Sequence, residues 1–539
     1  MARPSSCAQV ALRAGRKLLV LYSAWSGMTT SISNAPTEAI AERDALPPES
    51  RSTPAPVKLA RTVASRFIFL IICVAIVMTT LAFGTVHYWA LAVFEISAAA
   101  IVLLWAVDAW RSRLLRLSRN PLQLPLVGLF LVGLVQLLPL GSAASSSGNG
   151  NASLRTISFD PYSTRLALVQ IAALTIYFAA TLAFTDSPHR LRILVRTITI
   201  FGFVLAIFGM TQSFTSPTKV FWIRELQQST AFGPFINRHH FAGYMELAMA
   251  VPLGMLFSGS IEKDKRLLYA FAVFMMAVAL VMTASRGGII SLVTEIGFLV
   301  IIAGIRRRKH SRHRTEEREG KQARVRSAMI RAGLAFGFVL VIFTGVIMLG
   351  GESALTRFLG TVNSEDPTTG RAHFWSVTLD IIRNHPLTGV GLGAYSLVYT
   401  RYDTRNGLMR VEQAHNDYLQ TLSDAGVVGV ILGLFFLVAL FRAGFARRET
   451  DDTFRRGVAT GALAGCFAVL VHSFFDFTLH TTANALLFLI VAGLATMNGR
   501  IEQPSQHRRR RRSQRSAGAI DSPGETTTSS VGEESLARR

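Results

Sequence analysis

The sequence predicts an all-α, polytopic membrane protein with about twelve transmembrane helices and a long extracytoplasmic loop between the ninth and the tenth. Half of the 539 residues are hydrophobic, only 17% are charged, and the mean hydropathy is +0.37. This composition is too apolar for a soluble protein of this size. The apolar residues stand in long runs, many of them close to the ~20 residues that a helix needs to cross a bilayer. Basic residues gather in alternate connections between these runs, which is typical of membrane proteins.

The net charge of +23 does not indicate a nucleic-acid-binding protein, because much of it lies in the tails and in short loops beside apolar runs. The three cysteines, Cys7, Cys73 and Cys466, are too scattered for a disulfide framework or a zinc site. We therefore expect membrane lipids, and no nucleic acid, among the partners.

Residues 1–60 are expected to form a disordered, basic cytoplasmic tail, since they are polar and rich in Ser, Pro, Ala and Arg. The weakly apolar stretch 10–25 is interrupted by Arg13, Arg16 and Lys17. It is therefore too short and too broken to span a bilayer, and no clear cleavage site follows it. A mis-assigned start codon is a competing explanation for this segment.

Spans one to nine are expected within residues 61–349 and spans ten to twelve within residues 426–499. Residues 350–425 form the long loop between them, and residues 500–539 are a second disordered, basic cytoplasmic tail. The fifth span is expected to follow a short loop that contains His189, Arg190 and Arg192. The segments lie at about 67–84, 89–107, 122–140, 166–184, up to 214, 241–257, up to 283, up to 305, 332–349, 426–441, 458–474 and 483–497.

The distribution of basic residues predicts which connections share a side of the membrane. The basic connections are both tails and the loops near 115, 190, 263, 315 and 448. With about twelve spans these all fall on one side, and the loops near 86, 150, 225, 286, 390 and 478 fall on the other. The basic side is expected to be cytoplasmic, so both termini are cytoplasmic and the long loop is external.

Arg286, in the outward sequence TASRGG, is the first candidate functional residue. A charge near the bilayer core costs about 2.5–3.5 kcal/mol on insertion scales, so such an arginine is a functional candidate by default. Gly287 and Gly288 leave the backbone open to close approach by a ligand. The alternative is an arginine whose side chain reaches the interface and has no other role.

Asn237, Arg238, His239 and His240 stand together just before the sixth span. The adjacent histidines suggest metal, but neighbours in sequence do not face one another on a helix, and no nearby Asp or Cys completes a ligand set. Arg238 is better suited to bind an anion, with a plain topological charge as the alternative.

The run 374–382 has the pattern of an amphipathic helix that lies either on the outer membrane surface or against the helix bundle. The apolar face comprises Phe374, Val377 and Ile381, extended by Trp375, Leu379 and Ile382. The following GVGLG resembles a fragment of a phosphate-binding fingerprint, but it lacks the strand–helix context of a nucleotide site.

His415 is followed by Asn416 and, after nine residues, by Gly426-x-x-Gly429. The histidine is expected outside, at the mouth of a span. Imidazole titrates near neutral pH, so His415 suits general-base work on a hydroxyl. A hydrogen-bonded structural histidine is the alternative.

This spacing resembles the signature of the O-antigen ligase and polymerase superfamily. The upstream GRAHFWSVTLDIIRNHPLTGVGLG is similar to the stretch that precedes the signature there, and GPFINRHHFAGY and TASRGG resemble two earlier motifs. The resemblance implies a membrane glycosyltransferase without metal or other cofactor, with residues 350–425 as its catalytic loop. It implies an undecaprenyl-diphosphate-linked glycan donor on the outer face of the bacterial inner membrane.

Within that resemblance the essential histidine matches His415, one arginine matches Arg286, and a second is best matched by Arg238. The expected substrate-binding residues are Asn416, Arg371, Trp375 and Asn237. Arginines can grip the diphosphate leaving group bidentately without a metal, while His415 takes or orients the acceptor proton. We expect a single displacement with inversion.

The acceptor cannot be read from the residues: lipid A-core, a growing polysaccharide and a protein share the same signature. A transporter or flippase is the alternative from another class of protein, since transporters also commonly have about twelve transmembrane helices. Transporters often show internal repeats with sites at the midplane, whereas this sequence shows no repeat and its candidate residues lie at the outer boundary. A purely structural membrane protein would leave Arg286 and His415 on one side without a purpose.

Overall fold

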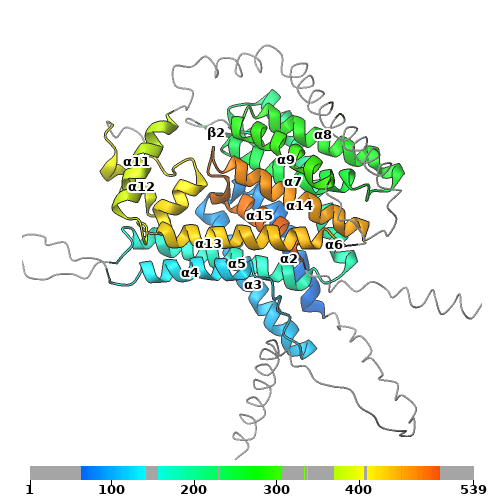
Figure 1. Cartoon of the computed structure of the whole chain (residues 1–539), viewed down its shortest axis with the longest axis horizontal. Coiled ribbons are helices and arrows are strands. Elements are labelled where there is room, and N and C mark those ends of the chain that lie inside the picture. Colours follow the sequence, from blue (N-terminus) through cyan, green and yellow to red (C-terminus); the bar gives the residue numbers. More distant parts are fainter. Residues whose placement is uncertain are drawn as a thin grey trace, which may run out of the picture. The chain divides into compact units, whose positions relative to one another are not determined.

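Helices form from most of the apolar segments that the sequence predicts. The computed structural model describes residues 62–140, 156–226, 231–304, 370–405, 410–450 and 452–497, with Gly333 and Gly337 as isolated positions. Across these ranges the chain is helical apart from loops and one hairpin of two-residue strands, β1 (Lys219–Val220) and β2 (Arg224–Glu225). The all-α class is therefore confirmed (Figure 1).

Eight of the described helices are long and apolar enough to cross a membrane, which confirms a polytopic membrane protein. They are α2 (Val63–Leu81), α3 (Tyr88–Ser112), α5 (Pro161–Phe184), α6 (Pro188–Thr215), α7 (Arg238–Phe257), α8 (Arg266–Met282) together with the preceding short helix η2 (Lys263–Lys265), α13 (Asp417–Arg447) and α14 (Thr453–His472). Two shorter apolar helices are α4 (Gln123–Gln136) and α15 (Thr482–Thr496), and α9 (Arg286–Gly304) occupies the expected eighth span. The expected ninth span at 332–349 and both expected tails lie outside the described residues, except for the two isolated glycines, so the count of twelve stays a prediction.

Side-chain acceptors set several of the helix starts. Asp160 and Ser187 cap α5 and α6, each with a proline at the first helical position, and Asp452 caps α14. The expected loop at 189–192 is wrong, because α6 begins directly after its cap Ser187 and already includes those residues. Arg190 is accommodated there by hydrogen bonds to Ser65 and to the carbonyl of Phe184.

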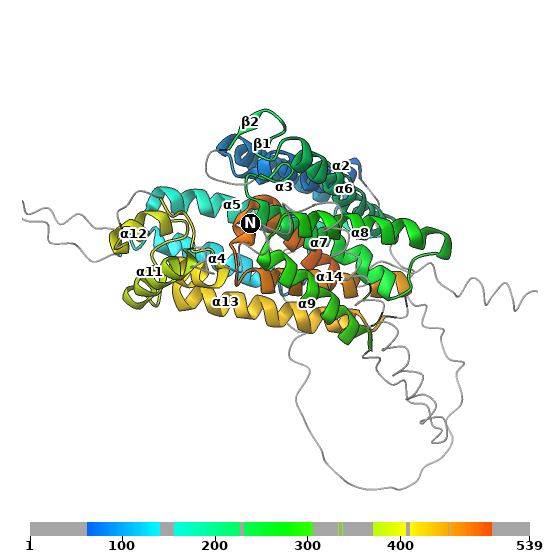
Figure 2. The same ribbon diagram turned by 90° about the horizontal axis from the view of Figure 1, so that it is seen from above.

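The most deeply buried helices are α7, α14 and α15, whereas α3 faces outward. Of the 18-residue apolar stretch of each helix, 89% is buried in α7 and 22% in α3. Glycines let α7 and α14 approach closely: a Cβ on Gly254 would lie 2.2 Å from Cα of Gly461. Such close backbone contact is a common basis of helix packing in membranes. Figures 1 and 2 show α7 and α14 side by side, as their extensive contacts also indicate.

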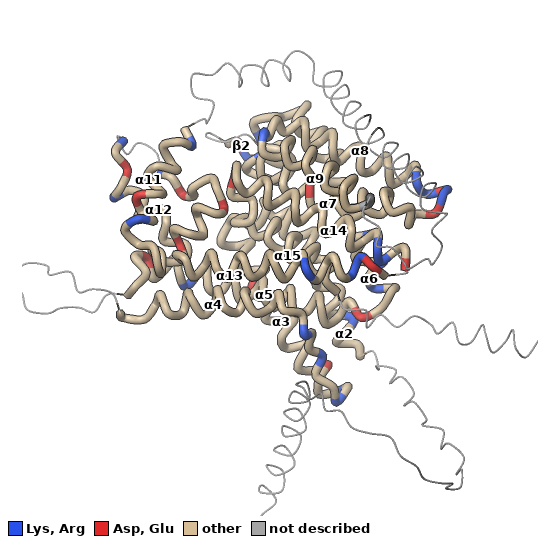
Figure 3. The backbone as a smooth tube through the Cα atoms, in the orientation of Figure 1, with Lys and Arg blue, Asp and Glu red and all other residues tan. Residues whose placement is uncertain are grey.

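The connections group at the two ends of the helices as the alternation of basic loops predicts. At one end the six outward connections contact one another, through Phe159–Val390, Arg224–His87, His239–Ser285, Thr482–Thr85 and His415–Asp476. At the other end the basic connections meet, through Arg116–Asp186, Asn120–Thr496 and Arg448–Ile302. Charged residues are correspondingly sparse along the middle of the helices (Figure 3). Which end faces the cytoplasm stays a prediction.

A small apolar core outside the main bundle contains α11 (Arg371–Asn384) and α12 (Tyr395–Tyr402). Figures 1 and 2 show both helices near the end where α13 begins. Val377 and Ile381 of α11 are buried there against Tyr395 and Tyr399. Most of the apolar face of the amphipathic run therefore packs on protein, whereas Leu379, expected on the same face, is exposed. This arrangement favours the second of the two expected placements over a helix lying on the membrane surface.

The glycines of GVGLG have a packing role. Gly389, Gly391 and Gly393 all have positive φ, and a Cβ on Gly389 would lie 2.4 Å from the backbone of Asp424. The segment crosses α13 at Gly426, whose φ of 62° and ψ of −161° interrupt the helix. Only glycine adopts this conformation readily.

Segment 386–391 repairs the backbone hydrogen bonds that α13 loses at this break. The amide of Val427 donates to the carbonyl of Pro386 instead of to Ser423, and Ser423 accepts from Val390. Such insertion into the helical ladder is a known cause of a kink, and it keeps backbone groups satisfied away from water.

Candidate functional site

The carboxylate of Asp476, in the connection between α14 and α15, is the centre of the candidate site. His415 Nδ1 lies 3.3 Å from its Oδ1, and Arg371 Nη2 lies 3.2 Å from its Oδ2. His239 Nδ1 is 3.8 Å from the same Oδ2. Burial alone would raise the pKa of Asp476, but the hydrogen bond with His415 and the electrostatic interactions with His239 and Arg371 lower that pKa well below its usual value. Asp476 is therefore a fixed negative charge.

The backbone and two aromatic rings hold His415 against Asp476. His415 has φ of 51°, an uncommon conformation for a residue with a side chain, immediately before the cap of α13. Its ring stacks on Phe374 at 5.7 Å and meets the edge of Phe477 at 4.8 Å. Trp375 Nε1 donates to the carbonyl of Ala414, 3.1 Å away, and so fixes the preceding residue. Because Nδ1 faces Asp476, Nε2 lies on the opposite edge of the ring.

Asn416 and Asp417 attach the start of α13 to the connection that carries Asp476. Oδ1 of Asn416 accepts the amides of Tyr418 and Leu419 at 3.0 Å, and its Nδ2 donates to the carbonyl of Phe474. Asp417 accepts from the hydroxyl of Ser473 at 2.7 Å. The structure thus gives Asn416 a capping role, while its expected contact with substrate stays a prediction.

The two candidate arginines occupy equivalent positions on neighbouring helices. Arg238 is the first residue of α7, whose cap is Asn237, and Arg286 is the first residue of α9. A 2.8 Å hydrogen bond between His239 Nδ1 and Ser285 Oγ joins these two helix starts. The amino-terminal ends of helices attract anions, so two of them, each bearing an arginine, form a region suited to phosphate groups.

The two adjacent histidines diverge, as helical geometry requires. His239 faces Ser285 and Asp476, whereas His240 Nδ1 lies 2.8 Å from Thr481 Oγ1, and its ring meets Phe477. Within the described ranges no group of three or more His, Cys, Asp or Glu residues is placed to hold a metal ion. Metal independence stays a prediction.

The structure brings His415, Arg371, Trp375 and the helix starts at Arg238 and Arg286 to the same end of the bundle. It also adds Asp476, which the sequence analysis did not name. This aspartate is the only acid between His472 and Thr482 and belongs to no recognised motif. The signal that could have found it was topological, since its connection was expected on the same side as His415.

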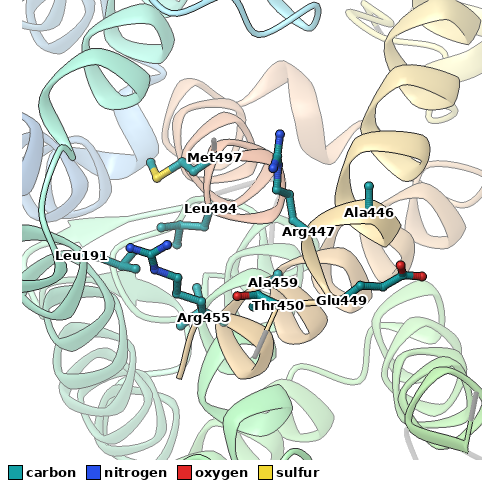
Figure 4. A pocket seen from close by; sticks show the side chains of 10 residues that line it. Leu191, Ala446, Arg447, Glu449, Thr450, Arg455, Ala459, Leu494 and Met497 are labelled. Atoms are coloured by element: carbon teal, nitrogen blue, oxygen red, sulfur yellow. The ribbon is translucent and has the colours of Figure 1, made fainter. Parts of the chain in front are cut away.

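A cavity of about 230 Å³ lies at the other end of the bundle (Figure 4). It is lined by Leu191, Ala446, Arg447, Glu449, Thr450, Arg455, Val458, Ala459, Leu494 and Met497. These residues come from the ends of α6, α13, α14 and α15 that meet the basic connections, and from the connection between α13 and α14 itself. The cavity is therefore separate from the candidate site.

Comparison with known proteins supports the resemblance seen in the sequence. Residues 271–434 match the family model described as O-Antigen ligase. The matched segment begins in α8, contains Arg286, Arg371 and His415, and ends within α13. Asp476 and Arg238 lie outside it. No curated protein matches the chain.

Proposed function

We propose that this chain, a member of the O-antigen ligase and polymerase superfamily by its residues 271–434, is a metal-independent membrane glycosyltransferase. It transfers a saccharide from an undecaprenyl-diphosphate carrier to an acceptor hydroxyl on the outer face of the bacterial inner membrane. The observation that carries this proposal is the His415–Asp476 pair beside the arginine-bearing starts of α7 and α9.

Asp476 prepares His415 to act as a general base. A carboxylate that accepts from Nδ1–H keeps the proton on that nitrogen and leaves the lone pair of Nε2 available, as in other carboxylate–histidine pairs. Nε2 then accepts the proton of the acceptor hydroxyl as its oxygen bonds to the anomeric carbon. The positive charge that develops on the imidazole is stabilised by the fixed negative charge of Asp476.

The leaving group requires positive charge on the other side of the reacting carbon. As the bond between the anomeric carbon and the phosphate oxygen breaks, the diphosphate takes the electron pair. Arg286 and Arg238, together with the helix starts that carry them, stabilise this charge without a metal. One displacement with attack opposite the leaving group inverts the anomeric centre.

Asn237, Asn416, Arg371 and Trp375 support this arrangement, through the caps and contacts described above and through contacts with the sugar. The prenyl tail lies between helices, and the acceptor enters from the aqueous side with both termini of the chain cytoplasmic. Lipid A-core, a growing polysaccharide and a protein all present the hydroxyl that this chemistry needs. We favour the first two acceptors.

The test is transfer by purified protein in lipid nanodiscs, with an undecaprenyl-diphosphate-linked glycan and each acceptor class in turn. Mass spectrometry should detect the glycosylated acceptor and free undecaprenyl diphosphate. His415→Ala should bind donor but lose turnover by about 10²–10⁴-fold. Arg286→Ala should lose both donor affinity and rate, and Arg286→Lys should not rescue fully, because a point charge lacks the bidentate geometry.

Normal turnover of His415→Ala would return His415 to a structural role. Absence of transfer to all three acceptor classes by wild-type protein that binds donor would refute the proposed function.

A further inference from the structure

A buried hydrogen bond between side chains of α7 and α14 lies beneath the candidate site. His472 Nδ1 is 2.7 Å from Glu246 Oε1, and both side chains are fully buried. Ionisable groups within a membrane are costly and are retained where they have a function. Neither residue takes part in the proposed chemistry, so their burial requires another explanation.

His472 contacts the helix that carries Arg286. A Cβ on Gly287, the residue after Arg286, would lie 2.8 Å from Cδ2 and 3.0 Å from Nε2 of His472. It would also lie 2.9 Å from Cβ of Phe475. The imidazole of His472 and the side chain of Phe475 therefore pack closely against the backbone of α9 at its first turn.

His472 also shapes the turn that carries Asp476. It is the last residue of α14, and its carbonyl accepts the amides of Phe475 at 2.7 Å and of Asp476 at 3.1 Å. One residue thus touches the backbone beside Arg286 with its side chain and holds Asp476 with its carbonyl. Glu246 fixes the orientation of that residue from a third helix.

We propose that the buried Glu246–His472 pair is a positioning element that holds Arg286 and Asp476 in register within the site. This inference rests on the proposed function for its kinetic consequence, but the structural consequence is independent of it. Loss of the Glu246 acceptor frees the imidazole, and the first turn of α9 and the turn 473–476 lose a common support.

Glu246→Ala and Glu246→Gln test this role in opposite directions. A glutamine oxygen can still accept from Nδ1–H of His472, whereas alanine cannot. In Glu246→Ala we expect kcat/KM for the lipid-linked donor to fall by about 10–100-fold, mainly through donor KM, because misplacement of a binding group by about 1 Å has effects of this size. Glu246→Gln should remain within about threefold of wild type, since it preserves the hydrogen bond.

Asp108→Ala is the matched control. Asp108 is another fully buried acid, in α3, and its carboxylate lies 3.1 Å from Nε of Arg116 at the other end of the bundle. Its removal breaks a buried contact of an acid with a basic group without touching the Glu246–His472 contact, so donor KM should stay near the wild-type value. An equal rise in donor KM in Asp108→Ala would overturn the proposal, because the effect would then be general to buried acids.

Gly287→Ala provides a second perturbation in case Glu246→Ala does not fold. Its new Cβ presses on His472 and Phe475 from the α9 side, so donor KM should rise as in Glu246→Ala. Gly297→Ala in the same helix is its control, because a Cβ there meets nothing within 4 Å.

Hydrogen–deuterium exchange separates this proposal from the proposed function. Peptides that cover residues 283–289 and 473–478 should exchange faster in Glu246→Ala and Gly287→Ala than in wild type and both controls. This result is expected even for protein that transfers no glycan. Unchanged exchange together with unchanged donor KM in folded Glu246→Ala and Gly287→Ala would refute the positioning role.

Discussion

Asp476→Asn should disable the proposed base while leaving the fold in place. Asparagine has the size of aspartate, but it can keep only one acceptor oxygen for the three groups that now share the carboxylate, His415 Nδ1, the amide of Phe477 and Arg371 Nη2. At least one charge-assisted hydrogen bond is lost, which costs about 1.5–3 kcal/mol of stability. If the amide NH₂ faces the ring, it donates to Nδ1 and moves the imidazole proton to Nε2. That tautomer cannot accept a proton from the acceptor, so we expect kcat to fall by about 10²–10⁴-fold.

The assay is single-turnover transfer at saturating lipid-linked donor, on protein whose folded fraction is measured by thermal unfolding. Asp403→Asn is the matched control, because Asp403 forms a second His–Asp pair in the outer region, with His373 Nε2 at 2.7 Å. The control should lose the same kind of contact without loss of the chemical step. An Asp476→Asn protein that is folded and turns over at the rate of Asp403→Asn would show that Asp476 does not orient the base.

The pKa of Asp476 also fixes the expected pH dependence. Because that pKa is lowered in the folded protein, the stability it contributes is fully present above the unfolded pKa of about 3.9 and is lost only as the pH falls toward the folded value. From about pH 5 to pH 8, Asp476 should therefore add no titration to stability or rate. A wild-type protein that loses no more stability than Asp476→Asn as the pH falls below about 3.9 would contradict a lowered pKa.

Three further outcomes are expected. Transfer by purified protein should persist in EDTA, and a loss that added Mg²⁺ or Mn²⁺ restores would refute metal independence. Reporter fusions at Asp403 should read as external and at Asp452 as cytoplasmic, and a cytoplasmic signal at Asp403 would exclude an external site. Gly426→Ala should lose about 1–3 kcal/mol, because its Cβ would lie 2.2 Å from the carbonyl oxygen of Leu387 in a conformation that strains any side chain. Gly433→Ala in the same helix, where a Cβ meets nothing within 4 Å, is the control in thermal unfolding, and equal losses would refute the packing argument.

The sequence was sufficient for the class of the protein and for the grouping of its connections, because both follow from long apolar runs and from alternating charge. It also indicated His415, Arg286 and Arg371, which stand in recognisable motifs. The pairing with Asp476 could not be predicted, since a lone acid in a short connection has no periodic pattern and its partner is 61 residues away.

Other features depend on three-dimensional packing. The apolar face of 374–382 has the same pattern whether it meets lipid or protein, and only the buried contacts with Tyr395 and Tyr399 distinguish the two. The glycines of GVGLG resemble a fragment of a phosphate-binding fingerprint in sequence, and only the structure shows that the backbone of Gly389 approaches Asp424 of α13. The burial of Arg190 in α6 likewise requires Ser65, which lies 125 residues earlier.

The break at Gly426 gives a physical meaning to the spacing between the histidine and the glycines. From Asn416 to Gly426 the helix advances about 15 Å, at ~1.5 Å a residue. Segment 386–391 holds the end of this helical stretch at Gly426 through backbone hydrogen bonds, and His415 precedes its other end. The length of the stretch therefore sets the distance between His415 and segment 386–391. Inserting one residue between them would lift His415 by ~1.5 Å and turn it by about 100° around the axis. Because both ends are fixed, the length of this helical stretch determines where His415 stands relative to segment 386–391.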